Sequence, residues 1–235
     1  MDQLSAYPKI LTESWLLNQT EKHHAVGGID VGGPRKGFHA SLIRLDGSID
    51  LYHSCSEVDV AKWFRDQETG IIAIDAPCQW RHDPKPRTAE TALVRLGIRC
   101  FFTPDRDRAV NHPTGYFDWM LQGERLYHSL AISHKIYQGD LSSNPSNVCF
   151  ETFPHAVSTL LSGKITGKNS KFEQRSHILL NHGLKLPAKI GIDHVDALIC
   201  ALTAVYFLGN QFQSLGDRES GLIVLPKPCR NTEKN

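Results

Sequence analysis

Short blocks of apolar residues, separated by polar turns, run along the chain from residue 25 to residue 208. The first three blocks suit strands because they are short and end in turn residues, and the pair Asp46-Gly47 predicts a hairpin between the second and the third. The later blocks suit helices and strands in alternation. The predicted strands are residues 25–30, 38–45, 49–54, 71–74 and 148–151, and the predicted helices are residues 58–66, 89–96, 119–136, 154–161 and 193–208.

This order of elements predicts an α/β fold with a mixed five-stranded sheet flanked by helices. The first three strands form a meander, and the later strands arrive through helices and should therefore pair parallel to the first. The same order is that of the RNase H fold. We expect a single RNase H-like domain over residues 25–225, with two insertions at about 78–147 and 162–192, an N-terminal appendage at 1–24 and a flexible tail at 226–235.

Composition narrows the class of protein without identifying it. The 235 residues are 40% hydrophobic and 22% charged, which excludes a disordered chain, a collagen-like chain and a coiled coil. The net charge is +1, so a nucleic-acid partner would have to meet a local basic patch. The longest apolar run, 197–208, is too short to span a bilayer, and we see no signal peptide, so a cytoplasmic protein without a membrane partner is expected.

Acidic residues stand where the predicted elements end or begin. Asp30, Asp75 and Glu151 each follow an apolar strand, and Asp193 and Asp196 open the last helix. In open α/β sheets, ligand sites lie beyond the carboxyl ends of the strands. If these strands are parallel neighbours, the acids converge on one edge of the sheet.

Clustered carboxylates repel one another unless cations neutralise them, and hard oxygen ligands favour Mg²⁺ or Mn²⁺. Two such ions can activate a water and stabilise the leaving oxygen of a phosphodiester. We therefore expect Asp30, Asp75, Asp193 and Asp196 to bind two Mg²⁺ or Mn²⁺ ions, with Glu151 at the rim as a further catalytic acid. Taken singly, each acid also suits a plainer interpretation, as a turn residue or a helix cap.

Several segments resemble a family of uncharacterised proteins that are described as predicted nucleases with an RNase H-like fold. The resemblance covers roughly residues 25–208 and rests on five motifs. They are Ala25-Val-Gly-Gly-Ile-Asp30, Ile74-Asp-Ala-Pro77, Leu96-Gly-Ile with Phe101-Phe-Thr-Pro104, Phe150-Glu-Thr-Phe-Pro154 and Asp193-His-Val-Asp-Ala-Leu198. The last motif is also similar to the final acidic helix of Holliday-junction resolvases of the RuvC type.

The resemblance implies a metal-dependent nuclease that hydrolyses phosphodiester bonds. By motif match, Asp30 stands for the first-strand aspartate, Asp75 for the fourth-strand acid, and Asp193 with Asp196 for the last-helix pair. Glu151 matches an acid typical of the predicted-nuclease family.

Two other functions stay open. The turn Asp30-Val-Gly-Gly33 fits the first phosphate loop of an actin-like nucleotide-binding phosphotransferase or ATPase, although Asp75-Ala-Pro-Cys78 has no glycine for a second loop. A non-enzymatic nucleic-acid-binding protein is the third class. Basic residues in the two insertions point to a nucleic-acid partner, and the candidate contacts are Arg81, Arg87, Arg99, Lys164, Lys168 and Lys171.

Overall fold

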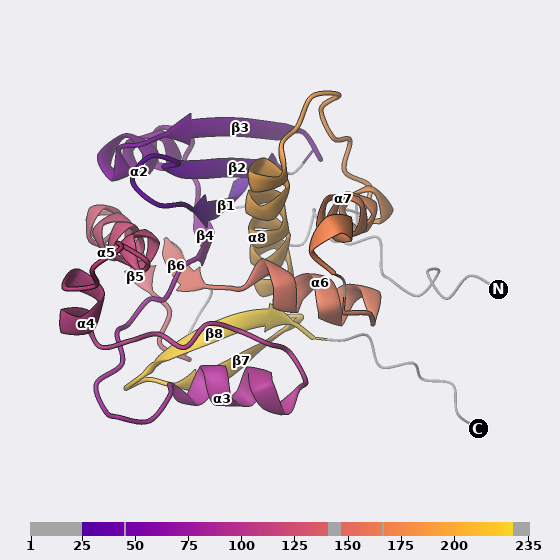
Figure 1. The fold of residues 1–235 in the computed structure, drawn as a ribbon. Helices are drawn as coiled ribbons and strands as arrows, with labels where there is room; N and C mark the ends of the chain where they lie inside the picture. Colours follow the sequence, from indigo (N-terminus) through magenta and orange to yellow (C-terminus); the bar gives the residue numbers. More distant parts are fainter. Residues whose placement is uncertain (1–24, 45, 141–146, 166, 228–235) are drawn as a thin grey trace, which may run out of the picture.

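A mixed sheet runs through the protein and carries helices on both faces (Figure 1). The computed structural model describes residues 25–44, 46–140, 147–165 and 167–227. The predicted appendage at 1–24 and residues 228–235 of the predicted tail lie outside these residues, but the tail was predicted to begin at 226, and Pro226 is instead the buried last residue of a strand. Within the described part, no helix is both long and apolar enough to cross a bilayer.

The described strands form one sheet in the order β3-β2-β1-β4-β6-β8-β7, with β5 paired to β6. Strands β1, β4, β6 and β8 run parallel, whereas β2, β3 and β7 pair antiparallel to their neighbours. The strands are β1 (Ala25–Val31), β2 (Phe38–Arg44), β3 (Ile49–Ser54), β4 (Ile71–Asp75), β5 (Lys135–Ile136), β6 (Val148–Glu151), β7 (Phe212–Asp217) and β8 (Gly221–Pro226). The helices are α2 (Glu57–Asp66), α3 (Thr88–Arg95), α4 (Arg106–Val110), α5 (Asp118–Leu130), α6 (Pro154–Ser162), the short 3₁₀ helix η2 (Lys168–Ser170), α7 (Lys171–Asn181) and α8 (Ile192–Leu208).

The α/β class and the mixed sheet are confirmed, but the predicted number of five strands is wrong, because the described residues form eight. Two of the additional strands, β7 and β8, make a hairpin after the last helix, and every residue of β8 is buried. The third, β5, lies inside the segment 119–136 that was expected to be one helix. Helix α5 ends at Leu130, and the chain then turns so that Lys135 and Ile136 pair with β6.

The segments expected as insertions hold more regular structure than their polar sequences indicate. Helix α4 lies in the first, and η2 and α7 lie in the second. Helix α7 forms because it buries Arg175, Ile178 and Leu179 on the face that meets its neighbours. Tertiary packing, rather than local propensity, therefore stabilises it.

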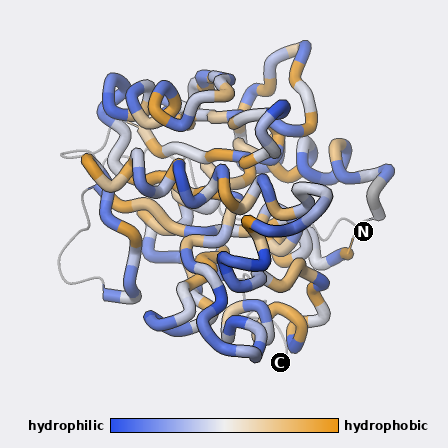
Figure 2. Tube along the Cα trace, turned by 60° about the vertical axis from the view of Figure 1, so that its left-hand side comes forward, coloured by the Kyte–Doolittle hydropathy of each residue, from blue (hydrophilic) through white to orange (hydrophobic). Residues whose placement is uncertain are grey.

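Each face of the sheet has its own hydrophobic core. Helices α2 and α5 cover one face, where Ile29, Ile72 and Ile74 are fully buried. Helix α8 covers the other face, where it packs over Val26 and Ala73. In Figure 2, hydrophilic colouring prevails on the outer turns of the tube, and hydrophobic stretches run through its middle.

Helix α8 lies directly against β1 because Gly28 has no side chain. A Cβ atom at Gly28 would overlap the backbone of Ala197 and Ala201. The missing side chain therefore lets the first turns of α8 approach the carboxyl end of β1. This close approach positions the acids of the last helix.

Candidate functional site

Four of the five predicted acids lie close together at one edge of the sheet. Asp30 and Asp75 are direct partners in the register of the parallel strands β1 and β4, so their side chains leave the sheet on the same face. That face is the one that α8 covers, because Gly28, two residues before Asp30, points at α8. The first two turns of α8 carry Asp193 and Asp196.

Lys36 lies between two of these carboxylates. Its Nζ donates to Oδ2 of Asp30 at 3.1 Å and to Oδ1 of Asp193 at 2.8 Å. Burial lowers the pKa of Lys36, but the charges of the two aspartates outweigh burial and raise it overall. The lysine therefore carries a full positive charge at neutral pH and neutralises part of the cluster.

His39 adds a nitrogen donor to the cluster. It is the cross-strand partner of Asp30 in the β1–β2 hairpin, and its Nε2 lies 3.9 Å from Oδ2 of Asp193. One possible ligand atom from each of Asp30, His39 and Asp193 lies within 4.8 Å of the other two. Burial, which outweighs the attraction of Asp193, lowers the pKa of His39 to about 4, so the imidazole is neutral at pH 7.

The remaining two acids differ in their partners. Arg175 of α7 is buried and donates from Nη1 to Oδ1 of Asp196. Asp75 has neither a hydrogen bond nor an ion pair from its carboxylate among the residues that the structure describes. Among the residues that the structure describes, two side-chain cations contact the four clustered carboxylates, Lys36 and Arg175.

The excess of negative charge and the burial both act on the pKa values. Burial, opposed by Lys36, raises the pKa of Asp30 to about 6. Burial raises the pKa of Asp75 well above its ordinary value, and the charges of Asp30 and Asp196 raise it further. Burial also raises the pKa of Asp196 in spite of Arg175. A divalent cation would relieve both the repulsion and the desolvation.

The donor set fits a hard divalent metal ion. It offers carboxylate oxygens, among them those of the unpaired Asp75, and one neutral imidazole nitrogen. An ion between Asp30 and Asp193 would have to displace the ammonium group of Lys36. That side chain is 44% exposed, so it has room to swing toward solvent.

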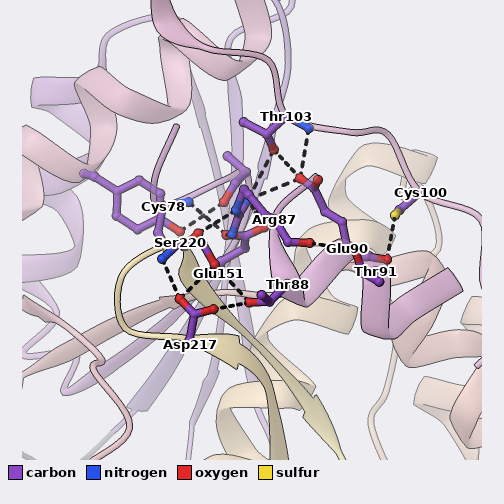
Figure 3. A network of polar contacts seen from close by, with 12 residues as sticks. Cys78, Arg87, Thr88, Glu90, Thr91, Cys100, Thr103, Glu151, Asp217 and Ser220 are labelled. Atoms are coloured by element: carbon purple, nitrogen blue, oxygen red, sulfur yellow. Dashed lines mark hydrogen bonds and ion pairs between the residues drawn. The ribbon is translucent and has the colours of Figure 1, made fainter. Parts of the chain in front are cut away.

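The fifth acid, Glu151, does not join this cluster. It pairs with Ile74, the residue before Asp75, in the register of β4 and β6, and its side chain therefore leaves the opposite face of the sheet. There Arg87 donates two hydrogen bonds to its carboxylate, at 2.6 Å and 3.1 Å, and the amide of Cys78 donates a third at 2.9 Å (Figure 3). Glu151 is thus paired with Arg87 and is not one of the clustered carboxylates, but it lines one pocket with Asp75, and its role as a catalytic acid at the rim of the metal site stays a prediction.

Arg87 is corrected as a candidate nucleic-acid contact, because its side chain is completely buried in this ion pair. Arg81 is partly exposed and bonds to Asp105 at 3.1 Å. Of the other four predicted nucleic-acid contacts, three have side chains that reach the surface. Arg99 and Lys164 are exposed, Lys171 is partly exposed, and the side chain of Lys168 lies outside the described part of the structure.

Three residues of the site were not found from the sequence: Lys36, His39 and Arg175. The hairpin register places His39 opposite Asp30, so counting residues outward from the glycine-rich turn would have indicated it. No local signal marks Arg175, because its contact with Asp196 depends on how α7 packs on α8.

Comparison with known proteins gives one match. No curated protein and no solved structure matches the chain. A family model described as "Protein of unknown function (DUF429)" matches residues 28–220, which include the acid cluster, Lys36, His39 and Arg175. Since this match spans most of the sequence, the chain belongs to the DUF429 family.

Proposed function

We propose that the protein is a metal-dependent nuclease with an RNase H-like fold, which hydrolyses phosphodiester bonds at the acid cluster. One observation carries the proposal. Asp30 and Asp75 are register partners on adjacent parallel strands, and the helix that packs on them delivers Asp193 and Asp196 to the same edge. An acid that only stabilises a turn or caps a helix has no reason to converge with three others, whereas a metal site requires such a set of oxygen ligands.

The sheet topology supports the same proposal. A three-stranded meander is followed by parallel strands on the far side of β1, in the order β3-β2-β1-β4-β6. This is the arrangement expected of an RNase H-like core. The hairpin β7–β8 extends that sheet beyond β6.

Each group in the cluster has a distinct task in the proposed reaction. Asp30, Asp75, Asp193 and Asp196 would hold Mg²⁺ or Mn²⁺, in the expected number of two ions. When bound, these ions polarise the phosphate and make water a better nucleophile. Arg175 orients the carboxylate of Asp196, and the neutral imidazole of His39 can accept a proton or bind a metal.

Nucleic acid is the proposed partner for two reasons. Divalent ions held by the four carboxylates would bind the phosphate groups of a nucleic acid, and exposed basic residues occur in both insertions. Arg99 and Lys164 are exposed, and Lys171 is partly exposed. Contacts from such side chains to backbone phosphates do not depend on base sequence and weaken as salt rises.

The test is a cleavage assay with single-stranded, duplex, hybrid and branched DNA and RNA, in Mg²⁺, in Mn²⁺ and in EDTA. The wild type should cleave at least one substrate only with metal, and Asp30→Asn and Asp75→Asn should each lose that cleavage by 100-fold or more. Asp66→Asn is the matched control, since Asp66 pairs with Lys62 on the exposed face of α2.

Two results would favour the other functions. ATP hydrolysis without cleavage of any nucleic acid would favour an actin-like phosphotransferase. Salt-dependent binding of nucleic acid with no cleavage in either metal would favour a non-enzymatic binding protein.

A further inference from the structure

His39 lies in the acid cluster, and neither nitrogen of its ring has a hydrogen bond to another described residue. Its side chain is 16% exposed. Nδ1 is buried without a hydrogen-bond partner, and Nε2 lies 3.9 Å from Oδ2 of Asp193, which is too far for a hydrogen bond. Since no hydrogen bond fixes the proton on Nε2, the lone pair of that nitrogen is available to a cation between the carboxylates.

Two further histidines hold this ring in place. The ring of His39 contacts the rings of His53 and His194, with centroids 4.5 Å and 4.8 Å away. Nε2 of His53 donates to the carbonyl oxygen of Lys36 at 2.9 Å, and Nε2 of His194 donates to that of Tyr52 at 3.3 Å. Both neighbours are thus engaged with the backbone, and of these three histidines His39 is the one that offers a ligand atom to the aspartates.

Asp30, His39 and Asp193 are close enough to bind one ion. Asp30 and His39 are register partners across the β1–β2 pair, so their side chains lie on the same face, where α8 brings Asp193. One ligand atom from each lies within 4.8 Å of the other two. Two atoms bound to one ion at about 2.1 Å are at most about 4.2 Å apart, so shifts of less than about 1 Å complete the site. In the described part of the chain, no other set of three His, Cys, Asp or Glu side chains comes this close.

The ligand atoms of the cluster therefore fall into two unlike groups. Asp75 and Asp196 interact electrostatically with each other but are not part of this close trio. They offer oxygen alone, whereas the trio adds an imidazole nitrogen. Mg²⁺ takes oxygen ligands and gives up its waters reluctantly, while first-row transition ions also bind imidazole nitrogen. The nitrogen of His39 therefore favours a transition ion at the trio.

We propose that the first metal ion binds to Asp30, His39 and Asp193, and that the imidazole makes this position select a transition ion such as Mn²⁺ over Mg²⁺. The inference rests on the proposed function, since it takes the acid cluster to hold metal ions. It adds which position fills first and which ion that position prefers. The ammonium group of Lys36, which bonds to Asp30 and Asp193, is the cation that this ion displaces. Asp75 and Asp196 are left to hold the second ion.

Three variants separate the ligand nitrogen from its surroundings. His39→Gln removes the imidazole and keeps a polar side chain. His53→Gln is the matched control, because His53 contacts the ring of His39 but bonds to the backbone of Lys36. Asp75→Asn removes a carboxylate from the second position without changing the size of the side chain. Melting temperatures in EDTA check that each variant folds.

The experiment adds one equivalent of Mn²⁺ to the metal-free protein and records pulsed EPR spectra, which detect a nitrogen nucleus bound to the ion. The wild type should show this nitrogen coupling, His39→Gln should lose it, and His53→Gln and Asp75→Asn should retain it. Titrations that follow the EPR signal of free Mn²⁺, with Mg²⁺ as competitor, give the affinities for both ions. His39→Gln should weaken Mn²⁺ binding tenfold or more and Mg²⁺ binding less than threefold.

The outcomes separate this metal position from the nuclease activity. A wild type without nitrogen coupling, or unchanged Mn²⁺ affinity in His39→Gln, would overturn the inference even if the protein cleaves nucleic acid. If His39→Gln does not fold, the other histidines decide: the coupling must persist in both His53→Gln and His194→Gln, and its loss in either would overturn the inference. Nitrogen-coupled Mn²⁺ that needs His39, in a protein that cleaves nothing, would uphold the inference and overturn the proposed function.

Discussion

Lys36 donates a hydrogen bond of 3.1 Å to Asp30 and so places a protein cation where the proposed chemistry requires a metal cation. The same ammonium lies 2.8 Å from Asp193. Lys36 and a metal ion therefore compete for the same carboxylate oxygens, and this competition can be measured.

Replacing Lys36 with methionine should make the metal-free protein less stable and the metal-bound protein relatively more stable. The lysine side chain is 44% exposed, so its ion pairs are expected to contribute only about 1 kcal/mol. In EDTA the melting temperature of Lys36→Met should fall below that of the wild type. The rise in melting temperature on adding Mn²⁺ should be larger in the variant, because ligand binding to the folded state adds to its stability.

Lys62→Met is the control for that substitution, since Lys62 forms an exposed pair with Asp66 far from the acid cluster in sequence. It should leave the metal response unchanged. A smaller response to Mn²⁺ in Lys36→Met than in the wild type would show that the lysine assists metal binding instead of competing with it.

Asp30 should make the stability of the metal-free protein depend on pH. Its pKa is raised from 3.8 to about 6 in the folded state, so between these values the folded protein holds a proton that the unfolded chain has released. The free energy of unfolding therefore falls as pH rises from about 4 to about 6, by up to about 3 kcal/mol from this group. Asp30→Asn cannot titrate there and should lose less stability over that range.

The measurement is urea unfolding of wild type and Asp30→Asn in EDTA at several pH values from 4 to 7. The stability of the variant relative to the wild type should increase with pH. A constant difference between the two proteins would mean that Asp30 titrates in the same way in the folded and unfolded chains.

Gly28→Ala should destabilise the protein strongly and weaken metal binding. The new methyl group would overlap the backbone of α8 at Ala197 and Ala201, and backbone cannot move aside as a flexible side chain can. We expect a loss of about 3 kcal/mol in unfolding free energy, at the upper end of overpacking effects. Gly33→Ala is the matched control, because a Cβ atom there meets nothing within 4 Å.

Chemical denaturation of both glycine variants would give these free energies. Equal stability of the two would contradict the close packing of α8 on β1. Mn²⁺ titration of any Gly28→Ala protein that still folds should show weaker binding, because Asp193 and Asp196 move with the helix.

Arg87→Leu should cost about 3–5 kcal/mol of unfolding free energy, because it leaves the buried carboxylate of Glu151 without its cation. Adding Glu151→Leu should recover a large part of this loss, since neither charge then remains buried in that pair. The two single variants and the double variant form a cycle that thermal or urea unfolding can measure. Additive losses in the double variant would mean that the two side chains do not interact.

The strand-end acids were predictable because the carboxyl ends of parallel strands meet at one edge whatever fills the rest of the fold. Asp30 and Asp75 follow from that rule and from the apolar blocks before them. Glu151 also lies at the carboxyl end of its strand, but its side chain is on the other face of the sheet. The reason is that Glu151 pairs with Ile74 and not with Asp75, and successive residues of a strand point to opposite faces. Local patterns do not report inter-strand register.

The C-terminal hairpin could not be placed for a similar reason. The apolar run in β8 is short enough to suit either a strand or part of a helix. Its position between β6 and β7 is set by long-range pairing, of which Glu151 opposite Ile223 is the contact with β6. The local pattern of apolar and polar residues does not show with which distant strand β8 pairs.

The three groups of the site that lie in the β1–β2 hairpin are close in sequence, and Asp193 is not. Asp30, Lys36 and His39 belong to one hairpin and can meet after a short loop closes, whereas Asp193 arrives only when α8 docks from far along the chain. The hairpin therefore contains both the carboxylate of Asp30 and the ammonium group of Lys36 that balances its charge. If the hairpin forms before α8 docks, Asp193 meets a lysine that is already paired with Asp30, and this ion pair reduces the repulsion between the two carboxylates.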